Sequence, residues 1–327
     1  MLYVLDSAKK SEIEKAKKLG VLGGTTNPSL LVEAINELRV TKGQDPSIQE
    51  HLAWVCEQYQ NGQLSLEVVA HKYEDILMQA RALWKFAIKY HVKDPLVKIP
   101  ITTASSENSP YLFDALRAIH TLSNEGIRLN ITVMMSAKQA LVAAVAGGHV
   151  LSIFAGRVDD YLSNLAQLSV KKDRHYPAMG MQQPGEKAGI VFKDMAGNVS
   201  GIHACAGAVY GLHELGFDRV VLAASIRNVE QAAEAQLVGC TEATLPYSVL
   251  EKFLSSKPQI SALQFDHAQL LSLIKELRDY NPAAITSLNG LREILCHPKT
   301  LEAVELFDDA ARQVPEYWGM LGTPLSQ

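Results

Sequence analysis

Short apolar runs recur along the chain at regular intervals, separated by amphipathic or alanine-rich stretches. Within the runs, successive side chains would point to opposite faces, as they do on a β-strand. We expect strands over Leu2–Asp6, Leu22–Asn27, Leu64–Ala70, Val97–Thr102, Ile127–Met135, Val150–Gly156, Arg219–Ser225 and Glu242–Pro246. The intervening stretches are typical of helices, among them Ser7–Leu19, Ser47–Gln60, Glu74–Tyr90, Pro110–Asn124 and Ser136–Ala146.

Regular alternation of strand and helix predicts that the strands are parallel. The chain has 327 residues, and eight strand–helix units match a closed (β/α)8 TIM barrel, an α/β fold that typically needs about 250 residues. A doubly wound open sheet is the alternative, but no predicted strand is followed by a GxGxxG turn. The TIM barrel is therefore the predicted fold class.

The strand pattern ends before Ile260, and helices are expected over Asp266–Asp279, Gly290–Cys296 and Pro298–Gln313. This region carries too little apolar surface for a core of its own. We therefore predict a barrel domain over residues 1–258 and a C-terminal helical arm, residues 259–327, packed on it. Lys171–Gly201, with several prolines and glycines, is expected to be an irregular excursion.

The amino-acid composition and the absence of certain motifs argue against several classes of function. The net charge of −4, with both signs well mixed, offers no basic stripe for nucleic acid. Four widely spaced cysteines without a CxxC pair favour reduced thiols and a cytoplasmic protein. The N-terminus lacks the apolar core of a signal peptide, and the most apolar stretch, Ala140–Ala155, is broken by glycines and too short to span a bilayer. No HExxH, GxSxG or P-loop motif occurs, so neither a metal nor a nucleotide cofactor is expected.

Lys98 is the most informative single residue. It lies inside the strand-like run Leu96–Ile101, where alternation turns it away from Val97 and Ile99. Lysine is rarely buried without a partner, and a desolvated lysine amine becomes a nucleophile toward carbonyls. Lys98 is thus a candidate Schiff-base residue. A lysine that snorkels to solvent or marks a strand edge is equally compatible with this run alone.

The same alternation places further polar side chains inside the barrel, near the carboxyl ends of the strands, where TIM-barrel active sites are built. The inward set is Asp6, Glu67, Lys98, Asn130, Thr132 and Ser152, with Phe154 beside Ser152, and with Asn27 and Ser225 ending the second and seventh strands. Any single member could be a buried polar residue satisfied by its neighbours. Convergence of the whole set favours a functional site, because buried charge is costly without partners.

Arg157 and Arg227 follow the sixth and seventh predicted strands, so both would rim the same end of the barrel as Ser225. Guanidinium groups bind phosphate through paired hydrogen bonds, and a nearby hydroxyl adds another. A phosphate site is therefore one interpretation of this trio. Surface salt bridges are the other.

Several ordered motifs resemble the transaldolase family, a branch of Schiff-base-forming aldolase barrels. The resemblance extends over roughly residues 2–250. It rests on LYVLD at 2–6, GGTTNPSL at 23–30, LSLEV at 64–68, VKIP at 97–100, LNIT at 129–132, SIFAGR at 152–157 and AASIRN at 223–228. Three departures are visible. ITTASSENSP follows the VKIP motif where the family commonly has a short TWEG-like continuation, SIFAGR replaces the commoner SPFVGR, and the Lys171–Gly201 excursion is longer than usual.

The resemblance implies a role for each candidate. Lys98 would form the Schiff base, Asp6 would be the acid–base, and Glu67 would act through a water held by Thr132. The remaining positions would bind substrate: Asn27, Asn130 and Ser152 at hydroxyls of the three-carbon unit, Phe154 beside it, and Arg157, Ser225 and Arg227 at the phosphate.

The activity implied is transfer of a dihydroxyacetone unit from fructose 6-phosphate or sedoheptulose 7-phosphate to an aldose phosphate, in the pentose phosphate pathway. Sugar phosphates are the expected partners, with no cofactor, nucleic acid or membrane, and a homo-oligomer is compatible with the sequence. One alternative is a fructose-6-phosphate aldolase that releases free dihydroxyacetone. The other is a non-catalytic sugar-phosphate binding protein, against which the complete Asp6–Glu67–Lys98 set argues, since binding alone has no use for a nucleophilic lysine.

Overall fold

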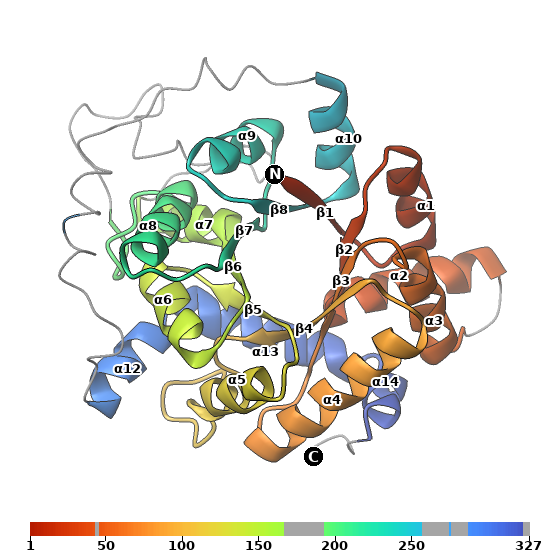
Figure 1. Cartoon of the computed structure of the whole chain (residues 1–327), viewed down its shortest axis with the longest axis horizontal. Coiled ribbons are helices and arrows are strands. Elements are labelled where there is room, and N and C mark those ends of the chain that lie inside the picture. Colours follow the sequence, from red (N-terminus) through yellow and green to blue (C-terminus); the bar gives the residue numbers. More distant parts are fainter. Residues whose placement is uncertain (43–45, 167–192, 257–274, 276–286, 323–327) are drawn as a thin grey trace.

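A computed structural model describes residues 1–42, 46–166, 193–256, 275 and 287–322. Eight parallel strands close into a barrel in chain order, and β1 pairs with both β2 and β8 (Figure 1). The strands are β1 Leu2–Asp6, β2 Gly23–Thr25, β3 Gln63–Glu67, β4 Asp94–Pro100, β5 Leu129–Met134, β6 Val150–Phe154, β7 Val220–Ala224 and β8 Glu242–Leu245. Closure of the sheet confirms the predicted TIM barrel and excludes the doubly wound alternative.

Helices surround the barrel. They are α1 Lys10–Lys18, α2 Pro28–Lys42, α3 Ile48–Gln58, α4 Tyr73–Lys89, α5 Asp114–Asn124, α6 Ala137–Ala146, α7 Ala155–Leu165, α8 Gly201–Glu214, α9 Val229–Leu237, α10 Tyr247–Ser256, α12 Leu288–Leu295, α13 Pro298–Arg312 and α14 Pro315–Met320. Serine side chains cap several of them: Ser47 accepts a hydrogen bond from the Glu50 amide, and Ser136 accepts one from the Gln139 amide. These caps fix where each helix leaves the preceding loop.

Each of the eight expected strands forms, and the differences lie at the ends. β3 stops at Glu67, so the apolar residues Val68–Ala70 belong to the following loop. β6 stops at Phe154 because α7 begins at the next residue, Ala155. Both predicted ends were late because apolar residues continue past the strand into buried loop and helix positions, where burial alone does not distinguish the two.

Two apolar layers hold the barrel. The larger lies between the strands and the surrounding helices. The smaller includes the strand residues Val4, Leu96, Val150 and Leu222 and extends to residues of α7 and α13. Toward the amino ends of the strands, Gln63 Nε2 donates a hydrogen bond to Glu242 Oε2 at 3.3 Å, joining β3 to β8. The opposite end is left for polar side chains.

The C-terminal helices lie against the barrel rather than apart from it. In Figure 1, α13 runs across the barrel behind β4 and β5, and it contacts α2, α7 and β5. The expected helices Gly290–Cys296 and Pro298–Gln313 correspond to α12 and α13. Apart from residue 275, the expected helix Asp266–Asp279 lies outside the described residues, as does most of the Lys171–Gly201 excursion. The division at residue 258 stays a prediction.

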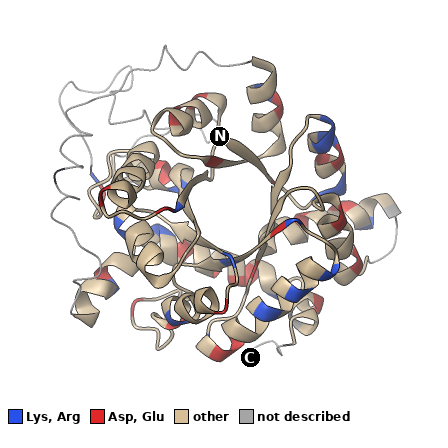
Figure 2. Ribbon diagram, in the orientation of Figure 1, with Lys and Arg blue, Asp and Glu red and all other residues tan. Residues whose placement is uncertain are grey.

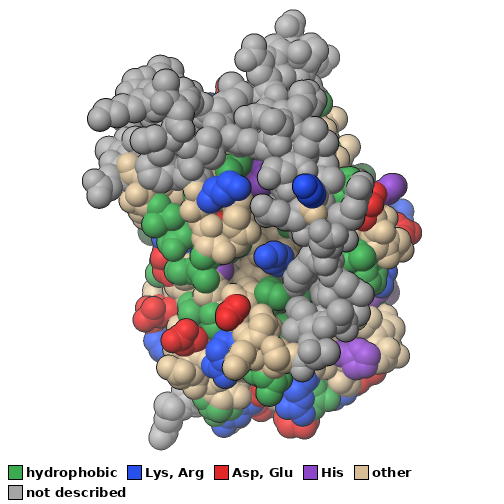
Figure 3. All heavy atoms as spheres, turned by 90° about the vertical axis from the view of Figure 1, so that its left-hand side faces the viewer, with side chains coloured by type: hydrophobic (Ala, Val, Ile, Leu, Met, Phe, Trp, Pro, Cys, Tyr) green, Lys and Arg blue, Asp and Glu red, His purple; other side chains and the backbone are tan. Residues whose placement is uncertain are grey.

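The described surface carries mixed charge. Basic and acidic residues are interspersed along the outer helices (Figure 2). From the side that carries α6 and α8, apolar, basic and acidic side chains are likewise interleaved (Figure 3). Within the described parts of the chain, every helix is too short or too polar to cross a membrane.

Candidate active site

Strand register brings three of the candidate residues into one row. Glu67 of β3 is opposite Lys98 of β4, and Lys98 is opposite Asn130 of β5. Ser152 of β6 donates to Asn130 Oδ1 at 2.6 Å, while Asn130 Nδ2 donates to Ser65 Oγ at 3.1 Å. The row therefore forms one connected line across four strands, as their alternation predicts.

Lys98 and Glu67 form a buried ion pair. Lys98 Nζ lies 3.1 Å from Glu67 Oε2, and the two side chains are only 6% and 1% exposed. Nζ also lies 3.5 Å from the Thr26 carbonyl oxygen. Apart from the ion pair, neither Glu67 oxygen has a hydrogen-bond partner in the described structure. The lysine is therefore neither snorkelling nor at an edge, which removes those two alternatives.

The Glu67 carboxyl can exchange a proton near neutral pH. Burial raises its pKa to about 7, against the opposing effect of the Lys98 charge. Burial also raises the pKa of Asp6, and again Lys98 works in the opposite direction. Two carboxyls and one amine thus share a poorly solvated space, the setting in which acid–base groups are tuned for catalysis.

A cavity of about 200 Å³ opens at this end of the barrel. Its lining residues are Asp6, Thr25, Asn27, Ser29, Leu30, Lys98, Asn130, Thr132, Ser152, Phe154, Arg157, Ala224, Ser225, Thr244 and Phe307. Nine of the sequence-predicted residues are among them. The buried Thr132 hydroxyl has no hydrogen-bond partner within the described residues, so it is available to a water or a substrate hydroxyl.

Glu67 faces a second, much smaller cavity instead. That cavity has a volume of about 20 Å³, and its lining includes Glu67, His71, Phe307 and Asp308. Such a volume is enough for about one water molecule. The Lys98–Glu67 ion pair therefore stands between the two cavities, with the amine on the large one and the carboxyl on the small one.

The loop residues at the rim are held by their own contacts. Asn27 Oδ1 accepts from the Leu30 amide at 2.9 Å and so caps α2, which leaves its amide nitrogen as the group to offer a substrate. Ser225 has a φ of 57°, in the left-handed region that serine rarely adopts. Non-glycine residues held in that region cluster at functional sites.

The two arginines are placed differently. Arg157 lines the cavity, with its guanidinium 5.9 Å from the Phe154 ring centroid and 3.9 Å from Glu302 Oε1. Burial lowers the pKa of Arg157, as expected for a poorly solvated cation. Arg227 does not line the cavity: its guanidinium bonds to Asp160 Oδ2 at 2.9 Å and to the Ser225 carbonyl at 3.3 Å. Of the expected phosphate trio, the geometry brings only Arg157 and Ser225 to the cavity wall.

Some cavity residues were not expected from the sequence. Thr25 and Thr244 lie on strands, and the alternation that identified Ser152 would have identified them too. Phe307 comes from α13, far along the chain, and no strand phase points to it. Among the described residues, no group of three or more His, Cys, Asp or Glu side chains could hold a metal ion.

Comparison with known proteins gives a consistent result. A family model described as Transaldolase/Fructose-6-phosphate aldolase matches residues 3–314. A protein named "Probable transaldolase" from Thermodesulfovibrio yellowstonii is 32% identical over 78% of this chain and 90% of its own length. Proteins of the same name from Desulfitobacterium hafniense and Bartonella henselae are 34% and 30% identical, over 76% and 78% of this chain and 89% of each of theirs.

Proposed function

Because the chain belongs to the transaldolase/fructose-6-phosphate aldolase family, we propose that it is a cytoplasmic transaldolase of the pentose phosphate pathway. It moves a dihydroxyacetone unit from fructose 6-phosphate or sedoheptulose 7-phosphate to an aldose phosphate, through a Schiff base on Lys98. The observation that carries this proposal is the buried Lys98–Glu67 pair at the wall of a polar cavity that also contains Asp6.

The first step makes the electron sink. A proton moves from the Lys98 ammonium to the Glu67 carboxylate, 3.1 Å away, leaving a neutral amine. The amine attacks the C2 carbonyl of the ketose to give a carbinolamine. Protonated Glu67 then returns its proton, through a water, to the C2 hydroxyl, which leaves as water and yields an iminium ion. Glu67 is again a carboxylate, paired with the new cation.

The second step breaks the carbon–carbon bond. Asp6 takes the proton of the C4 hydroxyl, the C3–C4 bond breaks, and its electrons pass to the iminium nitrogen, forming an enamine. The aldose phosphate leaves with its phosphate released from Arg157 and Ser225. Addition of the enamine to a second aldose, with return of the proton from Asp6, completes the transfer. Hydrolysis of the iminium by the reverse of the first step frees Lys98.

Trapping of the intermediate tests the proposal. Borohydride added with fructose 6-phosphate should reduce the iminium and label Lys98, which peptide mapping by mass spectrometry would locate. Lys98→Met should lose both label and activity, while the similarly charged Lys93→Met, outside the site, should keep both. Labelling at a different lysine, or activity in Lys98→Met, would refute the mechanism.

Phe154 favours transfer over release. A phenol at this position would offer a proton and anchor a water beside the enamine, whereas the Phe154 ring offers neither. We expect sedoheptulose 7-phosphate to form from fructose 6-phosphate and erythrose 4-phosphate much faster than free dihydroxyacetone forms without acceptor. Phe154→Tyr should increase dihydroxyacetone release and still form the Lys98 adduct. Equal rates of release and transfer in the unmodified enzyme would instead support a fructose-6-phosphate aldolase.

A further inference from the structure

The Phe307 ring separates the two cavities at the site. It lines the large cavity together with Lys98 and Arg157, and it lines the small one together with Glu67 and His71. Only 9% of Phe307 is exposed, so the ring fills space rather than projecting into solvent. Removal of the ring would join the two volumes beside the Lys98–Glu67 pair.

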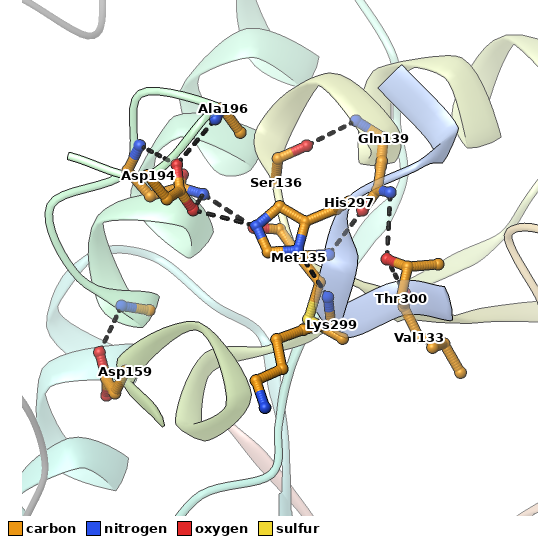
Figure 4. A network of polar contacts seen from close by, with 12 residues as sticks. Val133, Met135, Ser136, Gln139, Asp159, Asp194, Ala196, His297, Lys299 and Thr300 are labelled. Carbon is orange, nitrogen blue, oxygen red and sulfur yellow. Dashed lines mark hydrogen bonds and ion pairs between the residues drawn. The ribbon is translucent and has the colours of Figure 1, made fainter. Parts of the chain in front are cut away.

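The helix that carries Phe307 is anchored on both sides of it. Near the start of α13, Thr300 Oγ1 donates to the Val133 carbonyl at 3.0 Å and accepts from Gln139 Nε2 at 3.2 Å (Figure 4). His297, which caps α13, lies 3.3 Å from the buried Asp194 carboxylate. Beyond the ring, Asp308 Oδ1 lies 3.2 Å from His71 Nε2. The ring therefore holds a defined position.

The positions of the charged groups show which part of a substrate the ring would meet. The cation available to a phosphate, Arg157, lines only the large cavity. The small cavity is lined by apolar residues, Thr103, Glu67 and the His71–Asp308 pair, with no lysine or arginine among its described lining residues. A chain bound through Lys98 with its phosphate toward Arg157 would therefore have room to extend toward the small cavity only if Phe307 were absent.

We propose that Phe307 is a specificity-determining residue that limits the carbon unit held on Lys98 to three carbons. This inference rests on the proposed Schiff-base transfer. A ketose with one more carbon on the C1 side of its carbonyl would leave four carbons on Lys98 and would place the additional carbon against the ring. The strand and helix anchors leave the ring little room to move. A residue from the C-terminal helix thus decides what the barrel lysine carries.

The experiment compares borohydride labelling of Lys98 by fructose 6-phosphate with labelling by a 3-heptulose 7-phosphate. The second sugar has one more carbon on the C1 side of the carbonyl and the same chain between the carbonyl and the phosphate. The unmodified protein should label faster with fructose 6-phosphate by at least about tenfold, the usual effect of excluding one carbon from a closed pocket. Phe307→Ala should reduce that ratio at least fivefold, and Phe307→Leu should give an intermediate ratio. Phe253→Ala is the matched control, since Phe253 is a buried phenylalanine on α10 that lines neither cavity.

An unchanged ratio in both Phe307 variants, with Lys98 still labelled by fructose 6-phosphate, would overturn the inference and leave the transaldolase proposal intact. Failure of fructose 6-phosphate to label the unmodified protein would instead refute the proposed function. Should Phe307→Ala not fold, the ratio measured for Phe307→Leu decides, because leucine retains most of the packing of α13.

Discussion

At the scale of single residues, Glu67 combines two properties that buried carboxyls seldom share. The only described polar partner of its carboxyl is the Lys98 amine, and the pKa of that carboxyl lies at about 7. A carboxyl buried to improve stability would be expected to have more hydrogen bonds than this. Because few polar groups contact the Glu67 carboxyl, a proton can move between it and the Lys98 amine.

Glu67→Gln tests this role. An amide cannot carry the proton to the leaving hydroxyl, so Schiff-base formation should slow by about 10²–10⁴-fold. In the unmodified protein the rate should rise as pH rises through about 7, because only the ionised Glu67 carboxylate can take the proton from the Lys98 ammonium; this limb should vanish in the variant. Rapid-quench borohydride labelling at pH 6 to 8.5 measures both.

Glu242→Gln is the matched control for that profile. Glu242 also has a pKa of about 7, raised by burial, but it lies at the other end of the strands and lines neither cavity. Its replacement should leave the limb near pH 7 in place. Loss of the limb in this variant would assign the titration to something other than Glu67.

The sequence predicts which way a side chain points when the residue lies on a strand. Lys98, Glu67, Asn130 and Ser152 lie where alternation places them, because a strand allows a side chain only two directions. Arg227 does not reach the cavity wall. It follows the strand in a loop, where sequence provides no phase, and the Asp160 carboxylate on α7 holds it aside.

At the scale of elements, the sequence did not predict where α13 packs on the barrel. Its helical pattern was evident, but a helix pattern shows an apolar face without showing what that face meets. Its contacts with α2 and β5 join segments far apart in the chain. Phe307 and Asp308 became visible as site residues only once the helix was placed.

The His71–Asp308 contact should make the docking of α13 depend on pH. Burial lowers the pKa of His71, but the Asp308 carboxylate and the Thr103 carbonyl outweigh burial, so the pKa is raised overall, with Arg312 opposing. A histidine whose pKa is higher in the folded than in the unfolded protein adds stability. This stability is fully present below the unfolded pKa and is lost as pH rises through the folded pKa. The contact should therefore hold α13 more firmly in mild acid than above neutrality.

Asp308→Asn provides the measurement. Hydrogen exchange of the α13 amides should speed up between pH 6 and pH 8 in the unmodified protein, after correction for the intrinsic pH dependence, by an amount equivalent to roughly 1 kcal/mol. The variant should show fast exchange at both pH values. The neighbouring exposed pair gives a control, since Asp309→Asn disturbs only a contact with Arg312 on the same helix. A pH effect that survives in Asp308→Asn would assign it elsewhere.

At the scale of the whole molecule, the two ends of the barrel serve opposite purposes. The carboxyl ends of the strands surround the cavity, while the amino ends are closed by apolar side chains and the Gln63–Glu242 hydrogen bond. Because Glu242 is buried with a raised pKa, its ionisation opposes folding. The protein is therefore most stable below the pKa that Glu242 has in the unfolded chain, and its stability falls as pH rises toward 7.

Glu242→Gln should therefore stabilise the whole protein at pH 8 by roughly 1–3 kcal/mol and have little effect near pH 4.5. The new amide would also offer a donor to Gln63 Oε1, which has no partner among the described residues. Urea denaturation at the two pH values measures the difference. An equal change in stability at both would show that ionisation of Glu242 is not the cause.

The position of α13 late in the chain has a consequence for biosynthesis. A ribosome completes β8 at Leu245 before it reaches Phe307, and at synthesis rates of about 5–20 residues per second the intervening stretch takes roughly three to twelve seconds. During that interval a barrel that has already closed would present Lys98 without the ring that bounds its pocket. Cellular aldehydes and ketones of any size would have access to the amine. Helix α13 thus completes the selectivity of Lys98, a nucleophile that lies in the first third of the chain. Newly synthesised copies are the ones most exposed to adducts with other carbonyl compounds.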